Sequence, residues 1–517
     1  MKIQKILTWK LFNKRPFVFG LAAMVAGIFL AFSFFVSYWF LVGFGICVAA
    51  FVVAAISRHW FSAAGQHKTT IVIVLICFLL GVVSMSIREG VYRKNSIVEG
   101  VYYINAKVVA TTKYEDELYR TKIENVELFD SEIKVLQLKL NEAGYVWTKT
   151  DFEIGDIISF VGYYKAVEHD NISEISPNNA YKISIYSSVN VLGNSKTIFE
   201  KYKSLVLKDV TGNMNEASAG TAFAMLCGDA SKVEHETKDS YRAAGIGHIL
   251  AVSGLHVGFF VLLLSMIFNA LHVNKKTKFA IITIVLAIYC WLCGFSYSVL
   301  RASIMCVVLL YAEIRSRQYD GLSALCFATI IILGFIDPYQ LFAVSFLLSF
   351  FSVFSMFCLY KWLDCNFRKI YPKRLAGSLA IGIATSIGIL PWQIYYFGYF
   401  STFGILLNLI AIPLASVAFM LCFVIVPITL IIPQFGILVK SSEYVFWLLN
   451  EICGHVNEVP FSVVHTTISP ITIALWYVAI ALCSDYVFLP KKAKLWTRIG
   501  SIAAVVLLFG LNLGGVF

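Results

Sequence analysis

Residues 403–430 read FGILLNLIAIPLASVAFMLCFVIVPITL, a stretch of apolar side chains without a single charge. A helix needs about 20 such residues to cross a hydrocarbon layer of roughly 30 Å. This stretch is therefore long enough to span a bilayer. The rest of the 517-residue chain has the same character, because 59% of its residues are hydrophobic and its mean hydropathy is +0.76. Globular proteins contain only about 45–50% apolar residues, so the composition indicates an integral membrane protein.

Further apolar stretches predict an α-helical polytopic membrane protein with about 13 transmembrane helices. The predicted spans are 17–35, 38–57, 70–87, 246–270, 279–295, 299–314, 321–336, 339–360, 375–397, 403–430, 435–455, 470–488 and 498–514. The 12 cysteines are scattered through or beside these spans. We interpret them as small packing residues and predict no metal site and no cofactor.

The 42 Lys and Arg residues predict how the chain is oriented. After residue 245, every predicted outside loop lacks Lys and Arg, whereas the predicted inside loops contain clusters such as Lys275, Lys276 and Lys278. Because cytoplasmic loops carry an excess of these residues, we expect a cytoplasmic N-terminus and an extracytoplasmic region 88–245. Membrane orientation thus accounts for the net charge of +11, which is no evidence for nucleic-acid binding.

Between the third and fourth predicted spans, polar and apolar residues alternate with the period of half-buried strands. The predicted strands are 101–110, 118–129, 133–140, 157–163 and 181–186. Five short strands indicate an inserted extracytoplasmic β-barrel of the OB type. We divide the chain into N-terminal transmembrane helices (1–97), the OB-like domain (98–195), amphipathic helices on the outer membrane surface (196–245) and a second transmembrane domain (246–517).

An OB barrel can hold single-stranded nucleic acid by stacking bases on aromatic side chains in a basic groove. Tyr102, Tyr103, Tyr119 and Tyr163 are the stacking candidates. The alternative is that they are ordinary strand residues. Residues 98–195 contain 15 acidic and 9 basic side chains, which oppose phosphate attraction, so we expect weak binding at best.

The sequence GIGHILAVSGLHVGFF, residues 245–260, places His248, Ser253, Gly254 and His256 at the start of a predicted span. Polar groups inside a membrane are costly, so they usually face a cavity or a partner. The two histidines are eight residues apart, which places them close to one face of a helix. Ser253 and His256 could also meet as part of an intramembrane hydrolase, but no carboxylate is near them in sequence.

Arg301 is the one Lys or Arg that we place within a predicted span after residue 245. Such a charge is either a functional residue or half of an ion pair that locks helices together. Glu313 and Asp337 are the acidic residues considered as its partners. Pro391 and Pro413 are expected to break their helices and to direct helix N-termini toward an anion.

The stretch GHILAVSGLHVG, residues 247–258, resembles the hallmark of the ComEC competence family. Three further stretches support the resemblance: GFSYSVLRASIM (294–305), DPYQLFAVSFLLSF (337–350) and GILPWQIYYFGYFSTFGILLNLIAIPLAS (388–416). Members of this family form the inner-membrane channel for transforming DNA. The resemblance therefore implies transport of single-stranded DNA across a bacterial cytoplasmic membrane during natural transformation, with residues 246–517 as the competence-type channel domain. The pathway candidates are His248, Ser253, Gly254, His256, Arg301, Pro391, Asn408 and Pro413.

The resemblance also implies partners. Many family members end in a metallo-β-lactamase-like domain thought to degrade the non-transported strand, but the sequence contains no H-x-H-x-D-H zinc signature and no phosphate loop. We therefore expect no catalytic site in this chain. Beside single-stranded DNA and membrane lipid, the expected partners are a separate DNA receptor, a cytoplasmic helicase or ATPase and a separate nuclease. The alternative function is a transporter or flippase for an anionic small molecule or lipid.

Overall fold

A computed structural model describes most of the chain in two compact units. The described residues are 15–34, 68–95, 99–115, 118–130, 136–140, 144–166, 181–432, 434, 436–457, 459, 462–484, 486, 498 and 500. Unit 1 comprises 1–95, 311–398 and 466–517, and unit 2 comprises 96–310 and 399–465. The predicted span 38–57 and nearly all of the span 498–514 lie outside the described residues. The four predicted segments are grouped differently by these units, and their boundaries stay predictions.

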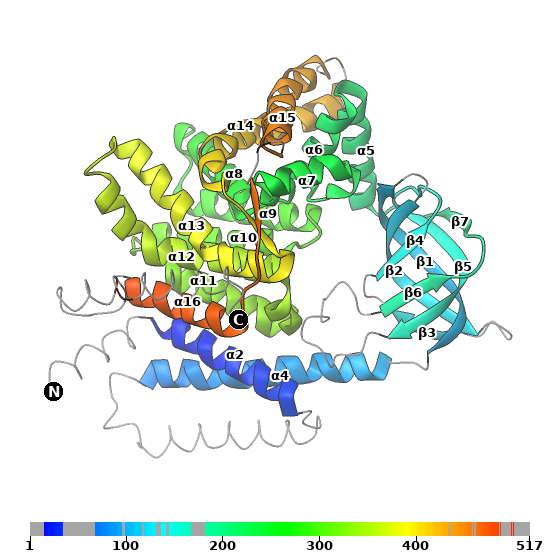
Figure 1. The fold of residues 1–517 in the computed structure, drawn as a ribbon, viewed down its shortest axis with the longest axis horizontal. Coiled ribbons are helices and arrows are strands. Elements are labelled where there is room, and N and C mark those ends of the chain that lie inside the picture. The colour runs from blue at the N-terminus through cyan, green and yellow to red at the C-terminus, as the bar shows by residue number, and fades with distance from the viewer. Residues whose placement is uncertain are drawn as a thin grey trace. The chain divides into compact units, whose positions relative to one another are not determined.

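Unit 1 is helical (Figure 1). Its α-helices are α2 (Pro16–Phe34), α4 (Lys68–Asn95), α11 (Gly321–Ile331), α12 (Val344–Phe367), α13 (Lys373–Phe397) and α16 (Pro470–Cys483). Helices α2 and α4 pack closely, because a Cβ at Gly27 would collide with the carbonyl oxygen of Phe78, and a Cβ at Gly81 with that of Met24. Small residues allow helix backbones to approach in this way inside membranes.

Helix α13 runs without interruption through Pro391. A proline has no N–H to donate to the carbonyl four residues earlier, here that of Ile387. The indole N–H of Trp476 donates to this carbonyl at 3.0 Å, and the hydroxyl of Tyr477 donates to the carbonyl of Gly388 at 2.7 Å. Side chains from α16 therefore replace the missing hydrogen bond. The prediction that Pro391 breaks its helix is wrong.

Unit 2 begins with a β domain. Its strands are β1 (Gly100–Glu115), β2 (Leu118–Asp130), β3 (Leu136–Leu140), β4 (Gly144–Thr148), β5 (Asp156–Ala166), β6 (Tyr181–Ile185) and β7 (Asn190–Asn194). The antiparallel order is β3-β2-β1-β5-β6, with β4 paired to β2 and β7 paired to β5. The five predicted strands are present. Sequence analysis missed β4 and β7, and the closed OB barrel is not confirmed, because among the described residues no ladder closes the sheet.

Alternation along the strands places one apolar face inside the β domain. Ile104, Ala106 and Val108 alternate along β1 and are buried, as are Ile123, Val126 and Leu128 on β2. Together with Val146, Ile158 and Phe160 they form a core of their own. The buried residues of these strands therefore follow the period-two pattern that indicated half-buried strands.

The helices of unit 2 follow the β domain. They are α5 (Ile198–Asn213), α6 (Glu216–Cys227), α7 (His235–Ala243), α8 (Gly254–Ala270), α9 (Lys275–Leu292), α10 (Tyr297–Ile314), α14 (Gly404–Ile431) and α15 (Gly436–Asn457). The short strands β8 (Tyr399–Ser401) and β9 (Val463–His465) pair with each other. Residues of α5, α6, α8, α9, α10, α14 and α15 contribute to one hydrophobic core.

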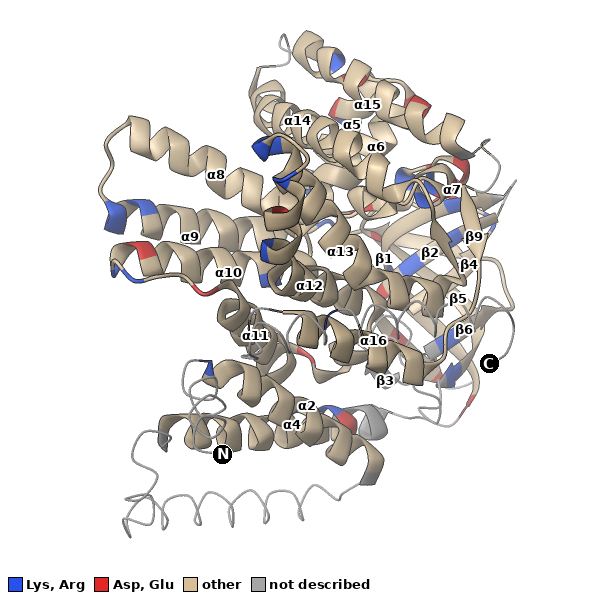
Figure 2. Cartoon of the chain, turned by 60° about the vertical axis from the view of Figure 1, so that its left-hand side comes forward, with Lys and Arg blue, Asp and Glu red and all other residues tan. Residues whose placement is uncertain are grey.

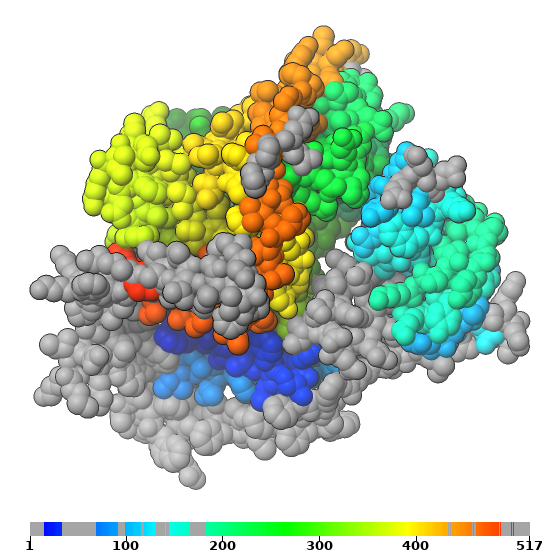
Figure 3. Space-filling model, in the orientation of Figure 1, coloured from blue at the N-terminus to red at the C-terminus, as the bar shows by residue number. Residues whose placement is uncertain are grey.

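The β domain contacts the start of α5 through a partly buried ion pair, and Figure 3 shows its cyan surface beside the green surface of this region. The ammonium of Lys107 lies 2.7 Å from the carboxylate of Glu200, which also accepts the N–H of Thr197 at 2.7 Å. Burial alone would raise the pKa of Glu200. The hydrogen bonds from Lys107 and Thr197 outweigh burial and hold this pKa below its ordinary value. The carboxylate is therefore charged at neutral pH and joins β1 to α5.

Six of the described helices are long and apolar enough to cross a membrane, which confirms a polytopic helical membrane protein. These stretches are Pro16–Ser33, Thr69–Gly90, Tyr297–Ile314, Val344–Phe367, Lys373–Phe397 and Gly404–Ile431. Shorter apolar helices are Gly254–Ala270, Gly321–Ile336 and Pro470–Cys483. Figure 2 shows that basic residues gather at the start of α9 and are sparse along the helix bodies. The total of about 13 spans and the orientation stay predictions.

Candidate functional site

The chain that leads into α8 is pressed against the start of α14. Gly245 has a φ angle of 74°, a left-handed conformation that favours glycine. A Cβ on Gly245 would lie 2.8 Å from the Cα of Gly404 and 2.9 Å from the Cβ of Ser401. The backbone of the 245–260 motif therefore lies directly on this segment of α14, and a side chain at Gly245 would separate the two.

His256 stabilises the first turn of α8 through a hydrogen bond to the backbone. Its Nδ1 accepts the backbone N–H of Ser253 at 3.2 Å, and the Ser253 hydroxyl lies 3.5 Å from the same nitrogen. Because Nδ1 accepts, Nε2 carries the proton in the neutral ring. The ring is only 1% exposed and stacks on Phe419 of α14 at 4.5 Å between centroids. His256 thus joins the start of α8 to α14.

His248 is placed differently from the prediction. It lies in the short helix Gly247–Leu250, where its side chain is exposed, and the backbone is extended at Ala251 and Ser253. The expectation that His248 and His256 share one helix face is therefore wrong. Within the described residues no carboxylate contacts His256, so the pair with Ser253 is not completed as a hydrolytic triad would require.

Arg301 projects from α10 to the first residue of α8. Its side chain is 3% exposed, and a Cβ on Gly254 would lie 3.7 Å from Nη2 and 3.2 Å from the Cβ of Ala302. Nε and Nη1 are buried without a hydrogen-bond partner among the described residues. Since buried charges are normally paired, this guanidinium is exceptional.

The ion pair considered for Arg301 is not found within the described residues. Asp337 belongs to unit 1, where its carboxylate lies 3.7 Å from the guanidinium of Arg88 and accepts the side-chain amide of Gln340 at 2.8 Å. It also accepts the backbone N–H of Tyr339 and so begins the next helical turn. Asp337 is therefore engaged within its own unit.

Two further pathway candidates lie on α14. The Oδ1 atom of Asn408 is buried and has no hydrogen-bond partner among the described residues. Pro413 lies inside α14, which continues through it, so the predicted helix break does not occur there either. Unit 2 therefore contains His248, Ser253, Gly254, His256, Arg301, Asn408 and Pro413, whereas Pro391 belongs to unit 1. Their role in a pathway stays a prediction.

The four tyrosines predicted to stack on bases are all half-buried. Tyr102 packs edge-on against Tyr164, Tyr103 packs against Phe129, and the Tyr163 hydroxyl donates to Glu99 at 3.3 Å. These side chains are thus engaged in the fold of the domain. Whether they bind nucleic acid is untested.

A different set of aromatic side chains is exposed beside β2 and β4. Tyr114 and Trp147 are 45% and 48% exposed, and their rings meet edge to face at 5.3 Å. Opposite Trp147 in the ladder stands Arg120, whose guanidinium lies over the ring of Tyr145 at 4.0 Å. We call Tyr114, Arg120, Tyr145 and Trp147 the aromatic face. Tyr145 and Trp147 were missed because β4 was not predicted, although the alternation of GYVWT was a usable signal. Arg120 lies on a predicted strand but was not singled out.

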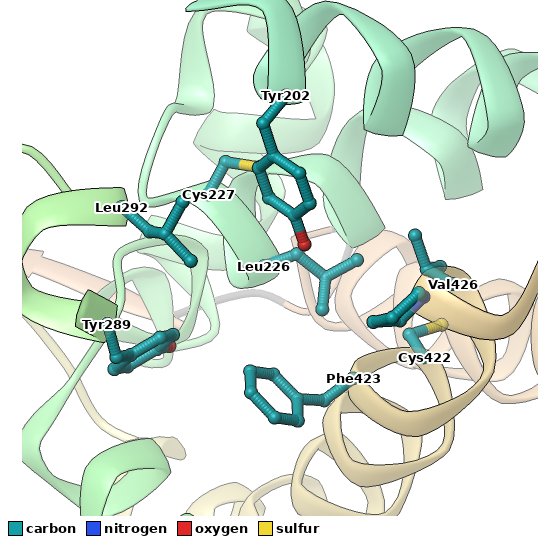
Figure 4. A pocket seen from close by; sticks show the side chains of 9 residues that line it. Tyr202, Leu226, Cys227, Tyr289, Leu292, Cys422, Phe423 and Val426 are labelled. Atoms are coloured by element: carbon teal, nitrogen blue, oxygen red, sulfur yellow. The ribbon is translucent and has the colours of Figure 1, made fainter. Parts of the chain in front are cut away.

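A pocket in unit 2 is mostly apolar (Figure 4). It is lined by Tyr202, Leu226, Cys227, Tyr289, Leu292, Cys422, Phe423, Val426 and Pro427. No lining residue carries a positive charge, so the pocket does not suit a phosphate group. Cys290 and Cys293 nearby have C-x-x-C spacing, but both are buried, and Cys290 donates to the hydroxyl of Ser303. No group of three or more potential metal ligands occurs among the described residues.

Comparisons with known proteins agree on one family. A family model described as "Competence protein" matches residues 225–509, which include α8, α10 and α14. ComE operon protein 3 of Bacillus subtilis (strain 168) is 25% identical over 358 residues, covering 67% of this chain and 45% of the relative. Recombination protein 2 of Haemophilus influenzae is 27% identical over 252 residues, covering 45% of this chain and 30% of the relative. No solved structure matches.

Proposed function

The chain belongs to the competence protein family, and we propose that it carries single-stranded DNA across the bacterial cytoplasmic membrane during natural transformation. The family model covers more than half of the chain, and it includes Arg301 and the motif at 245–260. The six helices capable of crossing a membrane support a transport role. The matched stretches span 45% or less of the two relatives, so the DNA cargo is part of the proposal.

The observation that carries the proposal is the unpaired charge of Arg301. A charged side chain buried within a membrane-spanning helix is costly, so it normally faces a partner or a cavity. Arg301 is buried, and no described carboxylate compensates for its charge. An anionic cargo would supply the missing partner while it passes. A DNA strand presents one such charge at every nucleotide.

The aromatic face of the β domain is our candidate for the first contact with the strand. Exposed rings stack on bases without sequence preference, and Arg120 adds a positive charge there. If the charge pattern orients the chain as predicted, this face lies outside the cytoplasm, where incoming DNA arrives. A separate receptor would deliver DNA, a cytoplasmic helicase or ATPase would pull the strand, and a separate nuclease would remove its complement.

Substitutions of Arg301 test the proposal. Arg301→Gln removes the charge and should abolish nearly all uptake, whereas Arg301→Lys keeps a point charge and should retain part of it. Channel abundance should remain unchanged, because no buried carboxylate loses its partner. The measurement is internalised labelled DNA per unit of channel protein in cells that produce this chain as their uptake channel.

Arg317→Gln is the matched control, because Arg317 is exposed and should tolerate the same change. Normal uptake per channel in Arg301→Gln would exclude Arg301 from the pathway. A fall in abundance with normal uptake per remaining channel would instead identify a structural residue. A transporter or flippase for an anionic small molecule or lipid is the second candidate function, since it would use the same buried charge. Loss of DNA uptake in Arg301→Gln would count against it.

A further inference from the structure

Two positive groups face each other where α8 meets α10. Helix α8 has 17 residues, and the N-terminus of such a helix carries about half a positive charge. Arg301 Nη2 lies within ordinary contact distance, 3.7 Å, of the Cβ position at Gly254, the first residue of this helix. The two groups repel each other unless an anion lies between or beside them. Their arrangement therefore calls for a bound anion.

Both groups also retain hydrogen-bond donors. Nε and Nη1 of Arg301 are buried without a partner among the described residues. The first N–H groups of an α-helix have no acceptor within the helix, which leaves those of Gly254 and Leu255 free of helical bonds. The next N–H, that of His256, already donates to the Ser253 carbonyl at 3.1 Å. The unpartnered guanidinium and the open helix end converge on the same place.

We propose that Arg301 and the first turn of α8 form one anion-binding site that takes a phosphodiester group of a nucleic-acid backbone. The inference rests on the proposed function and specifies the cargo group that the buried charge binds. Helix N-termini bind phosphate through backbone N–H groups and the helix dipole. A guanidinium binds two oxygens of the same phosphate through its paired N–H donors. The site thus offers donors from two sides to the two free oxygens of a phosphodiester.

Gly254 keeps the site open. A side chain there would begin 3.2 Å from the Cβ of Ala302, a tighter contact than most side chains make, and would occupy space beside the guanidinium. His256 contributes indirectly, because its Nδ1 already accepts the N–H of Ser253 and so holds the first turn in place. A phosphodiester carries one negative charge, which matches the single charge of Arg301 and allows the next phosphate to replace it.

Thermal unfolding of the purified full chain in maltoside micelles, which contain no phosphate, tests the site. The added anions are dimethyl phosphate, a thymidine trinucleotide, short-chain phosphatidylglycerol and chloride, each compared at equal ionic strength. We expect dimethyl phosphate and the trinucleotide to raise the unfolding temperature by a few degrees with saturation, and chloride to give no comparable rise. Arg301→Gln should show no such rise in unfolding temperature, and Arg317→Gln should show the same rise as the unmodified chain. Gly254→Ala should need at least about tenfold more anion to reach half of the rise.

Three results with the added anions would overturn the site. These are an equal rise with chloride, an unchanged rise in Arg301→Gln, or a larger rise with phosphatidylglycerol than with the trinucleotide, which would assign the site to lipid. A fourth comes from Gly254→Ala. Gly254→Ala preserves the charge and remains informative if Arg301→Gln fails to fold, because an unchanged midpoint would contradict the role of the helix end. Uptake separates the two claims. If Arg301→Gln loses uptake but the unmodified chain binds no phosphodiester, only this site is refuted. If Arg301→Gln loses phosphodiester binding but keeps uptake, only the proposed pathway is refuted.

Discussion

Arg301 and Trp147 mark two ways in which unit 2 can meet a polyanion. Arg301 offers a buried charge whose Nε and Nη1 atoms lack a hydrogen-bond partner among the described residues, whereas Trp147 offers an exposed ring next to a strand that carries Arg120. The contact at Arg301 is electrostatic and strong at low dielectric. The contact at Trp147 is base stacking and independent of sequence. A strand could be held loosely at the aromatic face and more firmly in the membrane region.

The aromatic face gives a prediction at the residue scale. Trp147→Ala should weaken the binding of a fluorescent oligothymidine to the purified full chain by about tenfold, because stacking on one base contributes about 1–3 kcal/mol. Tyr163→Ala should have a smaller effect, since Tyr163 is half-buried and bonded to Glu99. Fluorescence anisotropy at low salt measures both affinities. A larger loss in Tyr163→Ala would restore the tyrosines predicted from the sequence as the binding surface.

Single residues show what the sequence can reveal about the site. Arg301 was identifiable because a lone charge in an apolar stretch is visible without any structure. Its proximity to Gly254 was not, because the two residues are on separate helices and nothing in the sequence encodes their contact. His256 was recognised as unusual, but its stacking on Phe419 depends on the packing of α8 against α14.

At the scale of the elements, the sequence predicted where strands and helices lie better than where helices end or break. Period-two alternation located five strands, but β4 and β7 were missed, although β4 is no shorter than the predicted β3 and β6. The helix breaks predicted at Pro391 and Pro413 were wrong. They were expected because proline disfavours a helix interior by about 3 kcal/mol when nothing compensates for the lost hydrogen bond. In α13 the compensation comes from Trp476 on α16, which the local sequence around Pro391 cannot show.

This compensation can be tested with a double-mutant cycle. Trp476→Phe removes the donor to the Ile387 carbonyl and should destabilise the chain by about 1–3 kcal/mol, the cost of leaving a buried acceptor unpaired. In a Pro391→Ala background the restored backbone N–H can donate instead, so the same change should cost about 1 kcal/mol less. Unfolding temperatures of the four purified proteins in detergent give the coupling. Equal costs in both backgrounds would contradict this account of α13.

At the scale of the whole molecule, hydropathy predicted the class of protein because each span is recognisable from its own residues. Which spans pack together is not a local property. Unit 1 combines α2 and α4 with helices more than two hundred residues later, and unit 2 joins the β domain to α14 and α15. The sequence therefore predicted membrane helices and an inserted β domain, but neither the two units nor the meeting of α8 and α10.

The central claim is that single-stranded DNA passes Arg301, and a strand halted during uptake tests it most directly. Labelled DNA containing 4-thiothymidine, with streptavidin at its trailing end, would be arrested in cells that produce this chain and then irradiated. The account predicts cross-linked peptides from 254–260 and 297–305, and their loss in Arg301→Gln. Cross-links confined to the β domain while the leading end reaches the cytoplasm would contradict it.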